Sequence, residues 1–171
     1  MKYCLLLLSL AVTMLPMSVS AIDPNNITDA ERQMIVRNCR EAQRTMQRVT
    51  SIDPITRVNR GNGYSNMSKL MTALGSRAAY NSYNVPDLVG ATNLTQSLRQ
   101  RFADDYTDYE IALQRLIDID CVANPQNFYR TLVDVRVKRA VVAADVSDLE
   151  GQLDIFSRAM LDLQEQMKAR R

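Results

Sequence analysis

Apolar residues recur at every third or fourth position along most of the chain, which is the spacing of one face of an α-helix. The longest run lies between residues 125 and 169, where twelve positions alternate four and three apart. They are Phe128, Leu132, Val135, Arg139, Val142, Val146, Leu149, Leu153, Phe156, Met160, Leu163 and Met167. A 3.5-residue period kept over this length predicts one long coiled-coil helix, in which Arg139 is the only polar member of the stripe.

A second heptad pattern lies between residues 94 and 119 and predicts the partner of this helix. Its members include Phe102, Tyr106 and Leu116. In an antiparallel helix pair, the residue numbers of two opposing positions add up to a nearly constant value. Pairs from Leu116 with Phe128 to Leu98 with Val146 have sums of 244 or 245 in six successive layers. The pattern therefore predicts an antiparallel coiled-coil hairpin, with Arg139 opposite Tyr106 and near Asp105.

Two shorter helices are expected before the hairpin, at about 28–49 and 66–80. The first begins with a capping box, Thr28 to Glu31, in which each side chain accepts a hydrogen bond from the other's backbone N–H. Pro54 and the turn dipeptide Asn62-Gly63 predict a connector over 51–63, and Pro86 and Gly90 predict a break over 81–93. The fold class is all-α and elongated.

The last part of the long helix has no partner in a hairpin that begins at residue 94. Its stripe consists of Leu153, Phe156, Met160, Leu163 and Met167. Large apolar side chains in a row are not left open to water. Either the 66–80 helix covers the stripe, or a second copy or another protein binds there. The sequence leaves both alternatives open, and we expect a protein partner or a homo-oligomer through this helix.

The N-terminus has the pattern of an export signal. Lys2 precedes an apolar run from Cys4 to Leu15, and Val19-Ser20-Ala21 fits cleavage after Ala21. The run is short for a membrane-spanning helix, although retention as an anchor is the alternative. We expect a signal peptide over 1–21, one all-α domain over 22–171, with N-terminal helices to 93 and the hairpin from 94, and a secreted or periplasmic location.

Cys39 and Cys121 remain after removal of the signal and predict one disulfide in an oxidising compartment. Cys39 lies on the apolar face of its predicted helix. The two cysteines do not form the close C-x-x-C pair of a redox site. Cys39 and Cys121 are 82 residues apart. Closing a loop of that length stabilises a fold by about 4–5 kcal/mol in the chain-entropy model.

Composition excludes several chemistries. The 171 residues are 46% hydrophobic and 23% charged, with five Gly, five Pro and no His. Without His, Ser-His-Asp or Cys-His catalysis and imidazole metal sites are ruled out. We expect no metal, no cofactor and no small-molecule substrate. The net charge of +2, or +1 without the signal, gives no electrostatic reason to expect nucleic acid as a partner.

Charged clusters provide the candidate surfaces. Four arginines, Arg37, Arg40, Arg44 and Arg48, lie within 80° of one another on the 28–49 helix, and Arg57 and Arg60 follow in the connector. They suit an acidic partner or an anionic envelope surface, and the alternative is a solvated helix face. Asp104, Asp105 and Asp108 could act with Arg57 or Arg60 in acid–base chemistry, and the alternative is again an exposed face.

Two resemblances agree with an exported helical protein. Cys39 and Cys121, Asp53, Arg57-x-x-Arg60-Gly61, Tyr64, Pro125 and Phe128-Tyr129 resemble small exported helical proteins of reduced-genome, host-attached bacteria, which implies a location without an activity. The long arm and the signal resemble periplasmic holdase chaperones of the tentacled kind, but the strands of their body are missing. Sequons at Asn26, Asn66 and Asn93 leave glycosylation open.

These observations predict an exported, non-catalytic binding or structural protein that acts through a coiled-coil surface. A holdase chaperone of the envelope is the first alternative, because adaptable Met and Leu side chains suit varied clients. An enzyme that uses the surface carboxylates is the second.

Overall fold

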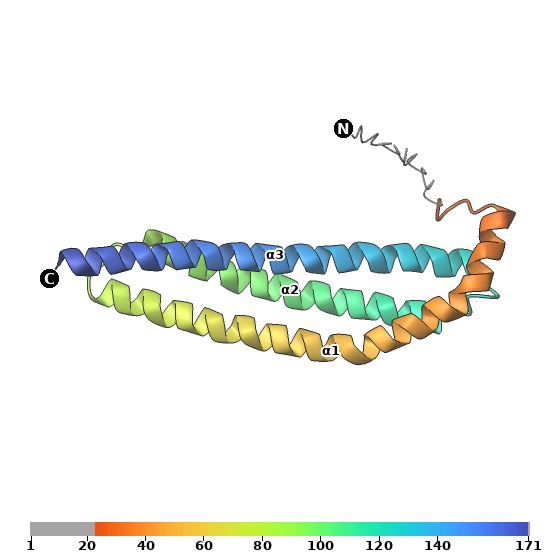
Figure 1. Ribbon diagram of the computed structural model, residues 1–171, viewed down its shortest axis with the longest axis horizontal. Coiled ribbons are helices and arrows are strands. Elements are labelled where there is room, and N and C mark those ends of the chain that lie inside the picture. The colour runs from red at the N-terminus through yellow and green to blue at the C-terminus, as the bar shows by residue number, and fades with distance from the viewer. Residues whose placement is uncertain (1–22, 171) are drawn as a thin grey trace, which may run out of the picture.

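The computed structural model describes residues 23–170, which form three helices joined by short loops (Figure 1). Helix α1 spans Asp29–Tyr80, α2 spans Pro86–Asp118 and α3 spans Pro125–Ala169. The described part of the chain contains no strand, so the predicted all-α class is confirmed. The predicted signal over 1–21 lies outside the described residues. No described helix has both the length and the hydropathy that crossing a membrane requires.

Helices α2 and α3 form the predicted antiparallel hairpin. Leu113 and Leu116 of α2 are buried together with Phe128 and Val135 of α3 in one core cluster. Helix α3 continues without interruption through Gly151, where an added Cβ would meet nothing within 4 Å. The apolar seam of the heptad pattern is therefore the seam along which the two helices pack.

The first helix is longer than the pattern predicted, because the expected connector over 51–63 is helical. Helix α1 contains Pro54 and runs through Gly61 and Gly63 to Tyr80. Proline cannot donate to the carbonyl four residues earlier, and Figure 1 shows α1 bending in this part of the chain. Packing keeps the segment helical: the Tyr64 ring meets the Phe102 ring of α2 edge-on, with the centroids 5.4 Å apart.

The predicted break over 81–93 is likewise shorter than expected. Only residues 81–85 separate α1 from α2, and Pro86 is the first residue of α2. Proline fits this position because the first helical turn has no intrahelical acceptor for its N–H. The extra length of α2 gives the far half of α3 a neighbour that the sequence analysis did not provide.

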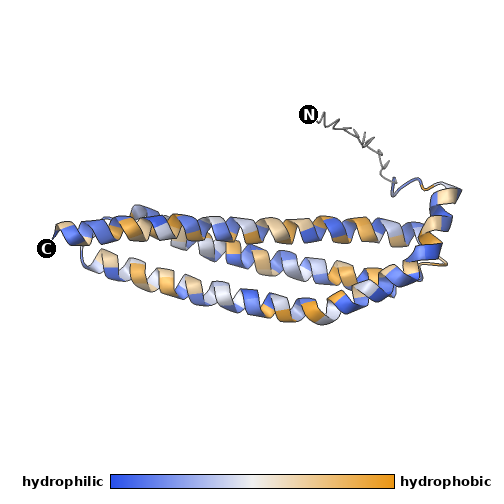
Figure 2. Cartoon of the chain, viewed as in Figure 1, coloured by the Kyte–Doolittle hydropathy of each residue, from blue (hydrophilic) through white to orange (hydrophobic). Residues whose placement is uncertain are grey.

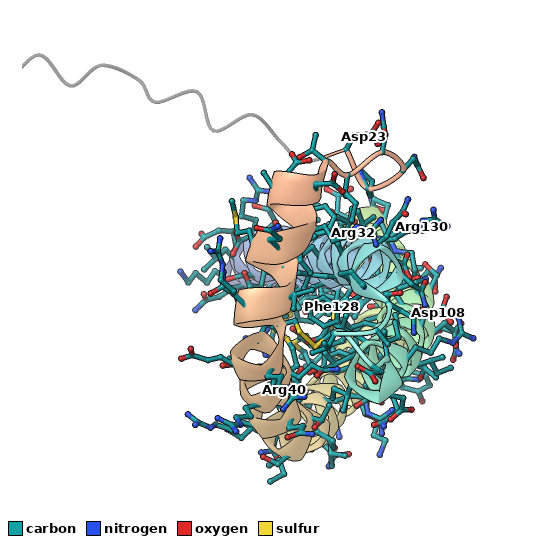
Figure 3. All side chains as sticks on the ribbon, turned by 90° about the vertical axis from the view of Figure 1, so that its right-hand side faces the viewer. Asp23, Arg32, Arg40, Asp108, Phe128 and Arg130 are labelled. Carbon is teal, nitrogen blue, oxygen red and sulfur yellow. A yellow bond between two sulfur atoms is a disulfide. The ribbon has the colours of Figure 1, made fainter. Side chains whose placement is uncertain are left out.

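The N-terminal half of α1 lies across the tip of the hairpin and is fastened there. Cys39 and Cys121 form the predicted disulfide, with the sulfurs 2.09 Å and the Cα atoms 5.9 Å apart. Figure 3 looks along the molecule at this end and shows the yellow S–S bond beside Phe128. Ile35, Cys39 and Phe128 are all buried, so the disulfide is part of a packed apolar contact.

The opposite end of the molecule joins the loop between α1 and α2 to the C-terminal part of α3. Gln166 donates to the Asn84 carbonyl at 3.0 Å, and Arg170 lies over the Tyr83 ring at 4.3 Å. Met71 and Ala78 of α1 and Leu88 of α2 are buried. All three helices thus contribute to this end of the core.

The C-terminal stripe is largely covered within the single chain. Leu163 is buried, and Leu153, Phe156 and Met160 are half-buried, whereas Met167 is 43% exposed. Helix α2 begins at Pro86 and not at residue 94, so it extends further along α3 than the sequence pattern predicted. Self-association through the stripe stays a prediction.

Candidate functional site

The outward face of the N-terminal half of α1 carries the four predicted arginines, here called the arginine ridge. Arg37, Arg40, Arg44 and Arg48 are all exposed. None of them forms an ion pair with an acidic side chain of the described residues. Figure 3 shows Arg40 on the outside of this helix, away from the disulfide. The packed face of the helix, which holds Cys39, is thus separated from a cationic outer face.

An exposed apolar patch, here called the bend patch, continues the arginine ridge along the same helix. Ile52, Ile55 and Val58 are 61%, 63% and 51% exposed. Their spacing carries on from Arg48 in steps of four, three and three residues, so they occupy the same side of α1. Hydrophobic segments are visible on α1 around the bend in Figure 2. Basic and apolar side chains therefore form one continuous outer surface.

The two remaining predicted arginines have different surroundings. Arg57 pairs with Glu110 of α2, with Nη1 and Oε2 2.9 Å apart. Arg60 is exposed and lines a groove on the inner side of α1. The six candidate arginines thus separate into the outward ridge, one ion-paired side chain and one groove residue.

The groove lies where α1, α2 and α3 meet beside the bend, and its volume is about 340 Å³. Figure 1 shows α1 bowed away from α3 along this part of the molecule. Its walls carry charged and hydroxyl side chains, and its floor is apolar. The lining residues are Asp53, Thr56, Arg60, Phe102, Tyr106, Tyr109, Arg139, Val142, Ala143 and Val146.

Two tyrosines tie the bend of α1 to α2 at one end of this groove. The Tyr109 hydroxyl donates to Asp53 Oδ2 at 2.8 Å, and the Tyr106 hydroxyl donates to the Asp53 carbonyl oxygen at 3.2 Å. Burial, followed by the hydrogen bond with Asp53, raises the pKa of Tyr109. Burial also raises the pKa of Tyr106. Both hydroxyls therefore keep their protons and act as donors at neutral pH.

Arg139 lines the groove and is exposed, although its position belongs to the apolar seam of α3. The neighbouring seam positions Val135 and Val142 are buried. Arg139 was predicted to lie opposite Tyr106, and both residues line this groove. The expected alternative, an ion pair with Asp105, does not form within the described residues.

A buried carboxylate lies between α2 and α3 beyond the groove. The Asp145 side chain is 2% exposed, and its Oδ1 accepts from Arg101 Nε at 2.6 Å. Arg101 also pairs with Asp148. Asp145 Oδ2 is buried without a hydrogen-bond partner. Burial and the hydrogen bond with Asp145 raise the pKa of Asp105.

The three carboxylates of the enzyme alternative do not converge with Arg57 or Arg60. Asp104 accepts from Gln100 on its own helix, Asp108 pairs with Lys138 at 3.6 Å, and Asp105 faces Asp145. Arg57 is paired with Glu110 and Arg60 lines the groove. Each carboxylate therefore has its own local surroundings.

Sequence reasoning missed Gln43 and Asp145. The Gln43 Nε2 donates to the carbonyls of Ile117 and Ile119, at 3.1 and 2.6 Å, where α2 ends. A single glutamine in a polar stretch gives no sign of this role. Asp145 precedes the seam residue Val146, and an acidic residue beside a seam could have been flagged as a buried one.

Comparison with known protein families, with curated proteins and with solved structures finds no match for the chain.

Proposed function

We propose that this is an exported, non-catalytic protein that binds an acidic partner protein through the outer face of α1. The binding surface consists of the arginine ridge and the bend patch. The observation that carries the proposal is that four exposed arginines without an ion pair continue directly into three exposed aliphatic side chains.

The chemistry of the ridge and of the patch beside it supports this choice of surface. Arg101 of α2 pairs across the hairpin with Asp145, and Lys138 of α3 pairs with Asp108. The ridge arginines instead face solvent. Arginine is enriched among the residues that dominate binding energy at interfaces, and charge complementarity speeds association and selects partners. The bend patch would supply the apolar centre of such an interface.

Support for export comes from the apolar N-terminal segment and from the disulfide, which persists in oxidising compartments. Support for a non-catalytic role comes from the lack of His in the whole sequence and from the separate surroundings of the acidic side chains. The alternative interpretation of the arginine ridge is a solvated helix face without a binding role. It does not account for the aliphatic patch that follows.

Site-specific photo-crosslinking in the producing cells tests the proposal. A photoreactive residue replaces Ile55 in one variant and Leu161 of α3, which is 61% exposed, in a matched control. We expect position 55 to give an adduct with a second protein and position 161 to give none. An adduct from position 161 alone would contradict the proposal, and an adduct with a second copy there would favour self-association through α3.

A further inference from the structure

The groove beside the bend has the chemistry of a small-molecule site that is separate from the outer face of α1. Its volume of about 340 Å³ lies within the range of ligand pockets. All three helices contribute to it, so the bend of α1 and the hairpin together define its shape. The ridge and the bend patch lie on the outward side of α1, whereas Asp53, Thr56 and Arg60 of the groove follow its inner side at steps of three and four.

Arg139 is the strongest sign that the groove is more than a packing gap. Eleven of the twelve seam positions of α3 are apolar, and the exception, Arg139, lines the groove together with Val142 and Val146. A valine or leucine there would extend the apolar floor formed by Val142 and Val146. Departures from an otherwise consistent pattern are expected at functional sites.

Two guanidinium groups face the groove without an ion pair among the described residues. Arg60 belongs to α1 and Arg139 to α3, so they lie on different walls. Phe102, Val142 and Val146 line the same groove and offer an apolar surface. Guanidinium is the side-chain group that best matches the geometry of a carboxylate.

The acidic residue of the groove is already engaged. Asp53 accepts the Tyr109 hydroxyl, and Asp53 and Arg60 are seven residues apart on α1, a rise of about 10 Å. Arg60 is therefore separated from Asp53 along α1, while Arg139 acts on Tyr109, the partner of Asp53. With two cations and one anion, the lining has a net positive charge.

We propose that the groove binds a small organic carboxylate with an apolar body, whose carboxylate lies between Arg60 and Arg139 and whose body packs on Phe102, Val142 and Val146. The tyrosines lie beside these arginines and, through their hydrogen bonds to Asp53, hold α1 in place. The proposal does not depend on the protein partner of α1.

Isothermal titration calorimetry of the purified protein, with its disulfide intact, tests this site. The probes are 3-phenylpropionate, its neutral amide analogue and inorganic phosphate. We expect the carboxylate to bind at least about tenfold more tightly than the amide, as the loss of a charge-assisted hydrogen bond predicts. We expect phosphate alone to bind more weakly than 3-phenylpropionate, because it cannot use the apolar floor.

Three variants locate the binding. Arg60→Gln and Arg139→Gln should each weaken the affinity for 3-phenylpropionate about tenfold, and the matched control Arg158→Gln on the exposed side of α3 should change it less than about twofold. All three side chains are exposed, so the fold is expected to survive, which circular dichroism checks. No binding of 3-phenylpropionate at about 10 mM would overturn the proposal. Equal binding of acid and amide, or equal effects of Arg139→Gln and Arg158→Gln, would overturn it as well.

Discussion

Asp145 is hidden almost completely where α2 packs against α3, and its two oxygens have different surroundings. One accepts from Arg101, and the other has no partner within the described structure. Asp105 lies beside it, and Arg101 lowers the pKa of Asp105 while Asp108 raises it. Burial of Asp105 raises its pKa, and the neighbouring Asp145 carboxylate, which has one free oxygen, raises it further.

The pH dependence of stability tests this carboxyl pair. Because the pKa of Asp105 is raised in the folded protein, the folded protein binds a proton more readily than the unfolded chain. The contribution of Asp105 to the free energy of unfolding is therefore fully present below the ordinary pKa of aspartate, about 4, and is lost as pH rises through the folded-state pKa.

Asp105→Asn should raise the free energy of unfolding at pH 7 and reduce its loss above about pH 4, because the uncharged amide can donate to Asp145. Urea denaturation at a series of pH values between about 4 and 7 measures both effects. The adjacent exposed carboxylate provides the control, Asp104→Asn, for which no such flattening is expected. A lower free energy of unfolding at pH 7 for Asp105→Asn would refute this description of the pair.

Gln43 supports a second residue-level prediction. Its amide reaches carbonyls at the end of α2 that have no intrahelical donor, so Gln43→Ala should lower the free energy of unfolding by about 1–2 kcal/mol. Gln47→Ala, one turn further along and exposed, should cost less than about 0.5 kcal/mol. Chemical denaturation of the two variants distinguishes a specific cap from a general effect of shortening a glutamine.

At the scale of the element, α1 shows where local sequence signals are overruled. Pro54 and Asn62-Gly63 indicate a connector, yet the segment is helical because its inner face packs on α2 through Tyr64 and the tyrosines that hold Asp53. The hairpin was predictable because its seam repeats over many heptads. The inner face of α1 contributes only scattered apolar residues, and no regular repeat indicates which helix covers them.

The glycines of α1 provide a matched test of this continuous helix. An added Cβ at Gly63 would meet nothing within 4 Å, whereas at Gly75 it would lie 3.1 Å from Leu88 Cδ2. Gly63→Ala should therefore raise the free energy of unfolding by about 0.5–1 kcal/mol, because alanine is the better helix former. Gly75→Ala should gain nothing or lose stability. A loss for Gly63→Ala in thermal or urea unfolding would indicate that residues 61–63 are not helical.

On the scale of the whole molecule, the disulfide decides how the N-terminal half of α1 is held. It closes a loop of 82 residues between the crossing helix and the hairpin tip. Replacement of Cys39 and Cys121 by alanine should lower the free energy of unfolding by about 2–5 kcal/mol. Hydrogen exchange should accelerate most over residues 29–49 and least over the centre of the hairpin. Uniform acceleration along all three helices would contradict a local fastening role.

The candidate surfaces were predictable to different degrees. The arginine ridge follows from a helical repeat of one residue type, and its exposure requires only that the opposite face be packed. The bend patch and the groove depend on the course of α1 past Pro54, which the sequence pattern placed in a connector. Arg139 was visible as an irregularity in the seam, but its surroundings were not, because they involve the third helix.

Charge reversal on the arginine ridge tests whether this surface recognises an acidic partner. One double variant carries Arg40→Glu and Arg44→Glu on the ridge. The matched control carries Arg158→Glu and Lys168→Glu on α3, and all four side chains are exposed. The measured quantity is the yield of the adduct from a photoreactive residue at position 55. We expect at least about a tenfold loss of adduct for the ridge variant and little change for the α3 variant. Equal yields from the two variants would contradict the proposal.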